Sequence, residues 1–130
     1  MTHHREPIDA PDAPAAVGPY VHAVRAGNLV FCSGQLALDP ASGELRGETF
    51  GEQARGCLDN LGAVAAAAGA TLQDAVRITI YLTDMGAFAE VNEVYAGYFT
   101  DAPPARAAIG VASLPKGGLV EMDAVLALES

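Results

Sequence analysis

The spacing of hydrophobic and polar residues predicts five β-strands and two α-helices. The strands are predicted where apolar residues alternate or run continuously, over residues 20–26, 29–38, 75–82, 105–112 and 119–128. The helices are predicted where apolar residues recur at helical spacing, over residues 51–68 and 86–99. The resulting order β-β-α-β-α-β-β favours an α+β fold, a mixed sheet with both helices packed on one face.

Capping and breaking residues set the ends of the two helices. Thr49 and Glu52 have the spacing of a capping box at the start of the first helix, and Gly69 follows its last turn. Asp84 can cap the second helix, and the Pro103-Pro104 pair ends it. Both helices are therefore bounded by recognisable local signals.

Turn residues indicate how the strands connect. Gly27-Asn28 predicts a hairpin between the first two strands, and the segment SLPKGG predicts a second hairpin between the last two. Residues 1–16 are rich in Pro, Asp and Ala and are predicted to form an N-terminal arm. The length of 130 residues suits one domain, residues 1–130, with no second module.

Charge and hydropathy narrow the possible partners. The net charge is −9 and the chain has one lysine, so it lacks the basic stripe that phosphate backbones attract, and nucleic acid is not an expected partner. No apolar run approaches the ~20 residues of a membrane span. The first residues show no signal-peptide core, and two cysteines make no disulfide framework, so a cytoplasmic setting is predicted.

Familiar catalytic and cofactor motifs are absent from the sequence. No GxGxxG, Walker-type or GxSxG motif occurs. His3 and His4 are expected to be solvated and His22 to be structural, while Cys32 and Cys57 lack metal-ligand spacing and are expected to be buried thiols. The sequence therefore implies no metal and no organic cofactor.

Two charged residues in apolar strands are the candidates for chemistry. Arg106 heads the run AAIGVA, whose small residues would leave room for an anion held by the guanidinium fork. Glu121 lies in LVEMDAVLAL on one face with Asp123 and could serve as a general base for a water molecule. Each also has a simpler interpretation, since Arg106 could extend into solvent and Glu121 could belong to a charged sheet edge.

Four segments together resemble the RidA/YjgF family of reactive-intermediate deaminases: APAAVGPYVHAV, FCSGQLALDPASGEL, the stretch from QARGCLDNLG to YAGYF, and PPARAAIGVASLPKGGLVEMDAVLAL. The resemblance covers about residues 13–128. It implies a chorismate-mutase-like fold assembled as a homotrimeric barrel, with ligand clefts between subunits. It also implies hydrolysis of 2-imino acids and their enamine tautomers, such as 2-iminobutanoate and 2-iminopropanoate, to 2-keto acids and ammonia, without a cofactor.

The resemblance assigns roles to particular residues. Arg106 matches the arginine that grips the substrate carboxylate, and Glu121 matches the acid that positions the attacking water. Tyr20, Ser33 and Asn92 match residues that line the pocket. Many members have a cysteine where this chain has Ala108, whose backbone could still hold ligand or water, so thiol chemistry at this position is ruled out.

Two other functions remain open, and so does the geometry of the site. The fold could serve a non-enzymatic carboxylate-binding or chaperone-like protein, or an endoribonuclease, although the charge of −9 argues against the last. If the final hairpin pairs Ala112 with Leu119, Arg106 lies roughly 13 Å along the strand from the position opposite Glu121. Either the true register is closer, or the two side chains meet across a subunit boundary.

Overall fold

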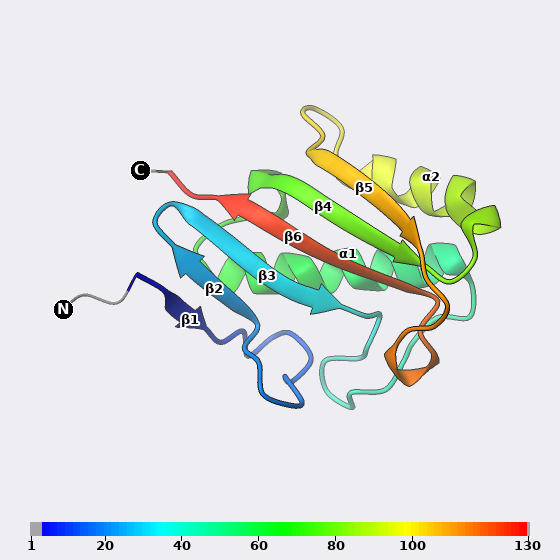
Figure 1. The fold of residues 1–130 in the computed structure, drawn as a ribbon, viewed down its shortest axis with the longest axis horizontal. Helices are drawn as coiled ribbons and strands as arrows, with labels where there is room; N and C mark the ends of the chain where they lie inside the picture. Colours follow the sequence, from blue (N-terminus) through cyan, green and yellow to red (C-terminus); the bar gives the residue numbers. More distant parts are fainter. Residues whose placement is uncertain (1–3, 130) are drawn as a thin grey trace.

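The structure, a computed structural model, describes residues 4–129. Its strands are β1 (Glu6–Ile8), β2 (Ala23–Ala26), β3 (Leu29–Gln35), β4 (Ala75–Leu82), β5 (Ala105–Gly110) and β6 (Val120–Ala127). The α-helices are α1 (Phe50–Ala67) and α2 (Phe88–Tyr98), and short 3-10 helices are η1 (Leu72–Asp74), η2 (Met85–Ala87) and η3 (Pro115–Gly117). The predicted α+β fold is confirmed, with a mixed sheet and both helices on one face (Figure 1).

The strands form one sheet in the order β1-β2-β3-β6-β4-β5. β4 and β5 are parallel and are connected through α2, whereas the other neighbouring pairs are antiparallel. The predicted hairpin between β2 and β3 is confirmed. The predicted hairpin between the last two strands is wrong, because β4 lies between β5 and β6. β6 carries fully buried residues and occupies the centre of the sheet, while the small-residue strand β5 forms an edge.

The core lies between the sheet and the helices. Alternation along β4 and β6 places the following fully buried side chains on the helix-covered face: Ile78, Ile80, Leu82, Val120, Met122 and Leu126. α1 packs behind β3 and β6, and α2 lies at the β5 end of the sheet (Figure 1). No helix of the described residues covers the opposite face, and Leu29, Phe31 and Ile109 on it are between 40% and 47% exposed.

The N-terminal segment is part of the fold, so the prediction of an arm over residues 1–16 is wrong for most of its length. Residues 1–3, including His3, lie outside the described residues. β1 pairs with β2, and Ala10 and Ala13 are buried. His22 anchors this segment, because its Nδ1 accepts the Ala10 N–H at 3.0 Å and its Nε2 donates to the Pro14 carbonyl at 2.8 Å. The structural interpretation of His22 is thereby confirmed, and His4 is exposed as expected.

The first two predicted strands are shorter in the structure than the apolar pattern suggests. β2 begins at Ala23, so Tyr20 lies in the preceding loop, and β3 ends at Gln35 rather than at Leu38. The register between β3 and β6 shifts between Cys32 and Gln35, which marks a bulge. This irregular end of β3 carries Ser33 and Gly34, and a cavity opens beside it.

Two glycines of α1 provide a matched test of its packing. A Cβ on Gly56 would lie 2.6 Å from the Cβ of Ala37, whereas a Cβ on Gly62 would meet nothing within 4 Å. We expect Gly56→Ala to lower the free energy of unfolding by about 1–3 kcal/mol through overpacking. Gly62→Ala should raise it by about 0.5–1 kcal/mol, because alanine favours the helix. Urea unfolding at one protein concentration measures both, and a destabilised Gly62→Ala would contradict the assignment of open space there.

Candidate functional site

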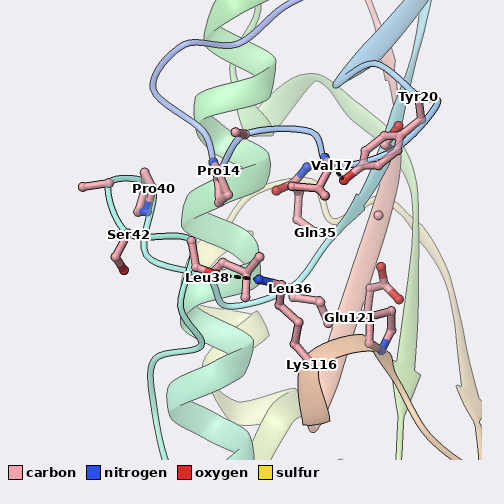
Figure 2. Close-up of a pocket in the computed structure, with 16 residues that line it drawn as sticks. Pro14, Val17, Tyr20, Gln35, Leu36, Leu38, Pro40, Ser42, Lys116 and Glu121 are labelled. Carbon is pink, nitrogen blue, oxygen red and sulfur yellow. Dashed lines mark hydrogen bonds between the residues drawn. The ribbon is translucent and has the colours of Figure 1, made fainter.

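A cavity of about 740 Å³ opens at the end of β3 and β6. We call it the Glu121 pocket. It lies between the loop that precedes β2, the loop that follows β3, η3 and β6 (Figure 2). Its walls are Pro14, Ala15, Val17, Tyr20, Ser33, Gly34, Gln35, Leu36, Leu38, Pro40, Ala41, Ser42, Gly43, Pro115, Lys116 and Glu121. Three of the predicted site residues, Tyr20, Ser33 and Glu121, therefore line one cavity.

Glu121 is the candidate base in this pocket. It pairs with Tyr81 of β4 and lies on the face of the sheet opposite the helices, since its neighbours Val120 and Met122 are buried in the core. Burial raises the pKa of the Glu121 carboxyl, and the nearby charge of Asp123 raises it further. A raised pKa makes this carboxylate a better proton acceptor than an ordinary glutamate.

Gly34 leaves room for the Glu121 carboxylate. A Cβ at position 34 would lie 2.5 Å from Glu121 Oε2, so the carboxylate would have to move away to make room for it. Gly34 directly follows the predicted site residue Ser33. Glycine at position 34 therefore allows the close approach of backbone and carboxylate seen here.

Tyr20 and Ser33 are held by local hydrogen bonds. The Ser33 hydroxyl donates to the Val21 carbonyl at 2.6 Å, which leaves its oxygen lone pairs free to accept. The Tyr20 ring is half-exposed, and its hydroxyl oxygen accepts the Val17 N–H at 3.4 Å. Both groups are thus positioned at the rim of the Glu121 pocket and retain hydrogen-bonding capacity toward it.

Arg106 lies in a separate group on the helix-covered face, which we call the Arg106 cluster. Its Nη1 donates to Asn92 Oδ1 at 2.7 Å. Its guanidinium carbon lies 5.2 Å from the ring centre of Phe88 and 4.9 Å from that of Tyr95. These contacts come from one side of α2, and they hold the guanidinium by a charge-assisted hydrogen bond and two cation–π contacts.

Phe88 and Tyr95 are two residues of the Arg106 cluster that were not predicted from the sequence. Their spacing along the helix from Asn92 was a usable signal, because residues three and four apart share a helix face. Ala108 follows Arg106 on the same side of β5, opposite Ile80. The predicted residues Arg106, Asn92 and Ala108 are therefore brought together, away from Tyr20, Ser33 and Glu121.

The two groups cannot meet in one chain. Arg106 is aligned with Ile78, which faces the helices, whereas Glu121 is aligned with Tyr81, which faces the opposite side. Two strand spacings and three residues along β4 place their backbones roughly 14 Å apart. A closer register within the chain is therefore wrong, and a site that uses both residues needs a second chain.

The two thiols are expected to be inert. Burial raises the pKa of Cys32 to about 12 and, together with the charge of Glu121, raises the pKa of Cys57 well above its usual value. Because the thiolate is the reactive form, iodoacetamide at pH 8 should leave the folded protein unmodified by mass spectrometry. The urea-unfolded chain, as a control, should take up the label at both cysteines. Labelling of Cys32 in the folded protein would contradict the assignment.

Among residues 4–129, no three His, Cys, Asp or Glu side chains gather in a group suited to a metal ion. Neither α-helix has the length and hydrophobicity that crossing a bilayer demands.

The sequence and the fold both match known proteins. Residues 10–128 match the family described as Endoribonuclease L-PSP. A RutC family protein from Sinorhizobium fredii, y4sK, is 52% identical over 95% of this chain and 98% of its own length. The 2-iminobutanoate/2-iminopropanoate deaminase of Bos taurus is 46% identical over 93% of this chain and 88% of its own length.

Solved structures place the fold in the same group. RidA from the Antarctic bacterium Psychrobacter has a TM-score of 0.90 and 46% identity, covering 95% of this chain and 99% of that one. The YjgF gene product from E. coli has a TM-score of 0.90 and 38% identity over the same shares. These likenesses define an α+β protein with a mixed sheet backed by two helices. The chain belongs to the RidA/YjgF family, which confirms the resemblance seen in its sequence.

Proposed function

We propose that this protein hydrolyses small 2-imino acids to 2-keto acids and ammonia. The observation that supports this most directly is the presence of a raised-pKa carboxylate in a cavity together with a pre-positioned arginine on the same small fold. Relatives named 2-iminobutanoate/2-iminopropanoate deaminase support the substrate class, including the Bos taurus protein at 46% identity.

The active cleft is proposed to form between two chains. The Glu121 pocket of one subunit would receive the Arg106 cluster of its neighbour, since the two groups occupy opposite faces of one sheet. A homotrimer would build three such clefts and would cover the apolar side chains of Leu29, Phe31 and Ile109. Light scattering coupled to size exclusion tests the assembly, and a stable, fully active monomer would contradict it.

The chemistry follows from these groups. The Arg106 fork would bind the substrate carboxylate and orient the C=N carbon toward the pocket. Glu121 would accept a proton from water as the water oxygen bonds to that carbon and the C=N π electrons move to nitrogen. The protonated Glu121 would then return the proton to nitrogen, giving a neutral carbinolamine. Cleavage of the C–N bond, with the hydroxyl proton passing through Glu121 to the departing nitrogen, yields the keto acid and ammonia.

A coupled assay tests the activity. Threonine dehydratase generates 2-iminobutanoate in solution, and semicarbazide traps the imine that is not hydrolysed. The protein competes with this trap, so it should increase the rate at which 2-oxobutanoate appears. A boiled sample controls for free hydrolysis. If the keto acid binds but the rate stays at the uncatalysed value, the protein is a carboxylate binder rather than a deaminase.

A further inference from the structure

Gln53 of α1 is a buried polar residue that the proposed mechanism does not use. It is 2% exposed, although glutamine is mostly found at protein surfaces. Its Nε2 donates to the Gly47 carbonyl at 3.0 Å, and its Oε1 accepts the Leu119 N–H at 2.8 Å. This side chain therefore connects α1 with two loops, the loop that follows β3 and the loop that enters β6.

Both loops form walls of the Glu121 pocket. The loop that follows β3 contributes residues between Leu36 and Gly43, and the loop that enters β6 contributes residues of η3. The two loops also meet at the surface, where Lys116 Nζ donates to the Gly43 carbonyl at 3.0 Å. Water can replace that exposed bond, whereas the buried bonds of Gln53 have no such substitute. Gln53 is therefore the connection that fixes the loops to the helix.

The bond to Leu119 fixes the backbone that leads to Glu121. Leu119 lies two residues before Glu121, and its carbonyl accepts the Thr83 N–H at 3.1 Å and the Thr83 hydroxyl at 3.2 Å. Gln53 and Thr83 thus hold Leu119 through its N–H and its carbonyl. Because the Glu121 carboxylate lies directly against Gly34, a displacement at the start of β6 would change where its oxygens lie. A misplacement of about 1 Å at a reacting group can cost roughly a hundredfold in rate.

We propose that Gln53 is a positioning residue for imino-acid hydrolysis, which holds the entry of β6 so that Glu121 stays aligned with the attacking water. An amide suits this double contact, because it offers a donor and an acceptor at the end of one side chain. Gln53 does not line the Glu121 pocket, so it acts through the backbone of Leu119. The inference rests on the proposed function, because the aligned group is the base of that reaction.

Gln53→Met keeps the length of the side chain and removes the amide. We expect kcat for 2-iminobutanoate to fall about tenfold to a hundredfold, because the base is misaligned. The dissociation constant of 2-oxobutanoate should stay close to the wild-type value, because Arg106 of a neighbouring chain binds the carboxylate. Gln53→Glu should have a higher kcat than Gln53→Met, since either protonation state of the introduced carboxyl offers the Leu119 N–H an acceptor oxygen.

Val64→Ala is the control for lost stability. Val64 is fully buried in α1, about three turns from Gln53, and makes none of these loop contacts through its side chain. Its truncation should lower the melting temperature and leave kcat at 25 °C unchanged. An equal fall of kcat in both variants would show a merely structural role and overturn the inference. If Gln53→Met does not fold, Gln53→Asn replaces it, because the shorter amide cannot span both partners.

A carboxyl ¹³C NMR titration separates this inference from the proposed function. The Glu121 signal is assigned by its loss in Glu121→Gln. Burial raises the Glu121 pKa, so a displaced carboxyl that gains solvent in Gln53→Met should titrate at a lower pH than in the wild type. If the wild type hydrolyses no imine, the proposed function fails, and an unchanged midpoint in Gln53→Met would overturn the positioning role as well. An active wild type with unchanged kcat in Gln53→Met overturns the positioning role alone.

Discussion

Arg106→Ala is expected to reduce kcat/KM for 2-iminobutanoate by at least about a hundredfold and to abolish measurable binding of 2-oxobutanoate, because the carboxylate loses its oriented partner. Arg106→Lys should recover little of this loss. An ammonium cannot reproduce the planar fork, nor the contacts that Phe88, Asn92 and Tyr95 make with the guanidinium. Steady-state kinetics and calorimetry on the purified variants measure both effects.

The same variant tests whether the cleft is shared between chains. Arg106→Ala and Glu121→Gln, each inactive alone, are mixed after dissociation and reassembly. In a cyclic trimer every mixed assembly contains one cleft with both native residues, so an equal mixture should recover about a quarter of the wild-type activity. The unmixed variants carried through the same procedure are the controls. Zero activity, with mixed trimers confirmed by native mass spectrometry, would show that the two residues do not act in one cleft.

Glu121→Gln is expected to lower kcat by roughly a hundredfold to ten-thousandfold while largely preserving the affinity for 2-oxobutanoate. The amide keeps the shape of the carboxyl and cannot accept a proton. A parallel loss of affinity would mean that Glu121 contributes to ligand binding rather than to proton transfer. The separation of kcat from the dissociation constant therefore decides which role the residue has.

The pH profile provides an independent measure of the same group. The base acts when it is deprotonated, so kcat should fall as the pH drops through the Glu121 pKa. Because burial and Asp123 raise that pKa, the fall should begin at a higher pH than for an ordinary glutamate. Asp123→Asn removes the like charge and should shift the acidic limb to lower pH.

Tyr81→Phe is the control for Asp123→Asn. It removes the hydrogen bond that the Tyr81 hydroxyl donates to Asp123 at 2.8 Å and keeps the charge of Asp123. The acidic limb should therefore stay close to its wild-type position in this variant. An acidic limb that does not move in Asp123→Asn would contradict the assignment of the limb to Glu121.

Local sequence signals were sufficient to predict the helix cap and most of the buried strand positions. The capping box at Thr49 and Glu52 is present as predicted, with the Thr49 side chain accepting the Glu52 N–H. The alternation along 75–82 correctly identified Ile78, Ile80 and Leu82 as a buried face of β4, whereas Val76, predicted on the same face, is 45% exposed. These features depend on neighbours a few residues apart, so they can be read from the chain directly.

The structure of the N-terminal segment was not predicted correctly from its composition. Its Pro, Asp and Ala residues resemble those of a solvated arm, yet Ala10 and Ala13 are buried and β1 pairs with β2. The contacts responsible come from residues distant in sequence, above all the His22 ring, which bonds to Ala10 and Pro14. Composition reports the average preference of a segment and contains no information about such a partner.

By itself, the sequence determined the two helices, the apolar faces of the strands, the likeness to the RidA/YjgF family and the candidate residues that follow from it. Only the tertiary structure decided that β4 separates β5 from β6, and that their registers on β4 place Arg106 and Glu121 on opposite faces of the sheet. Strand order depends on which long-range pairings bury the most apolar surface, and the alternation within a strand is the same whatever its neighbour. The division of the candidate site into two groups is therefore a property of the assembled sheet.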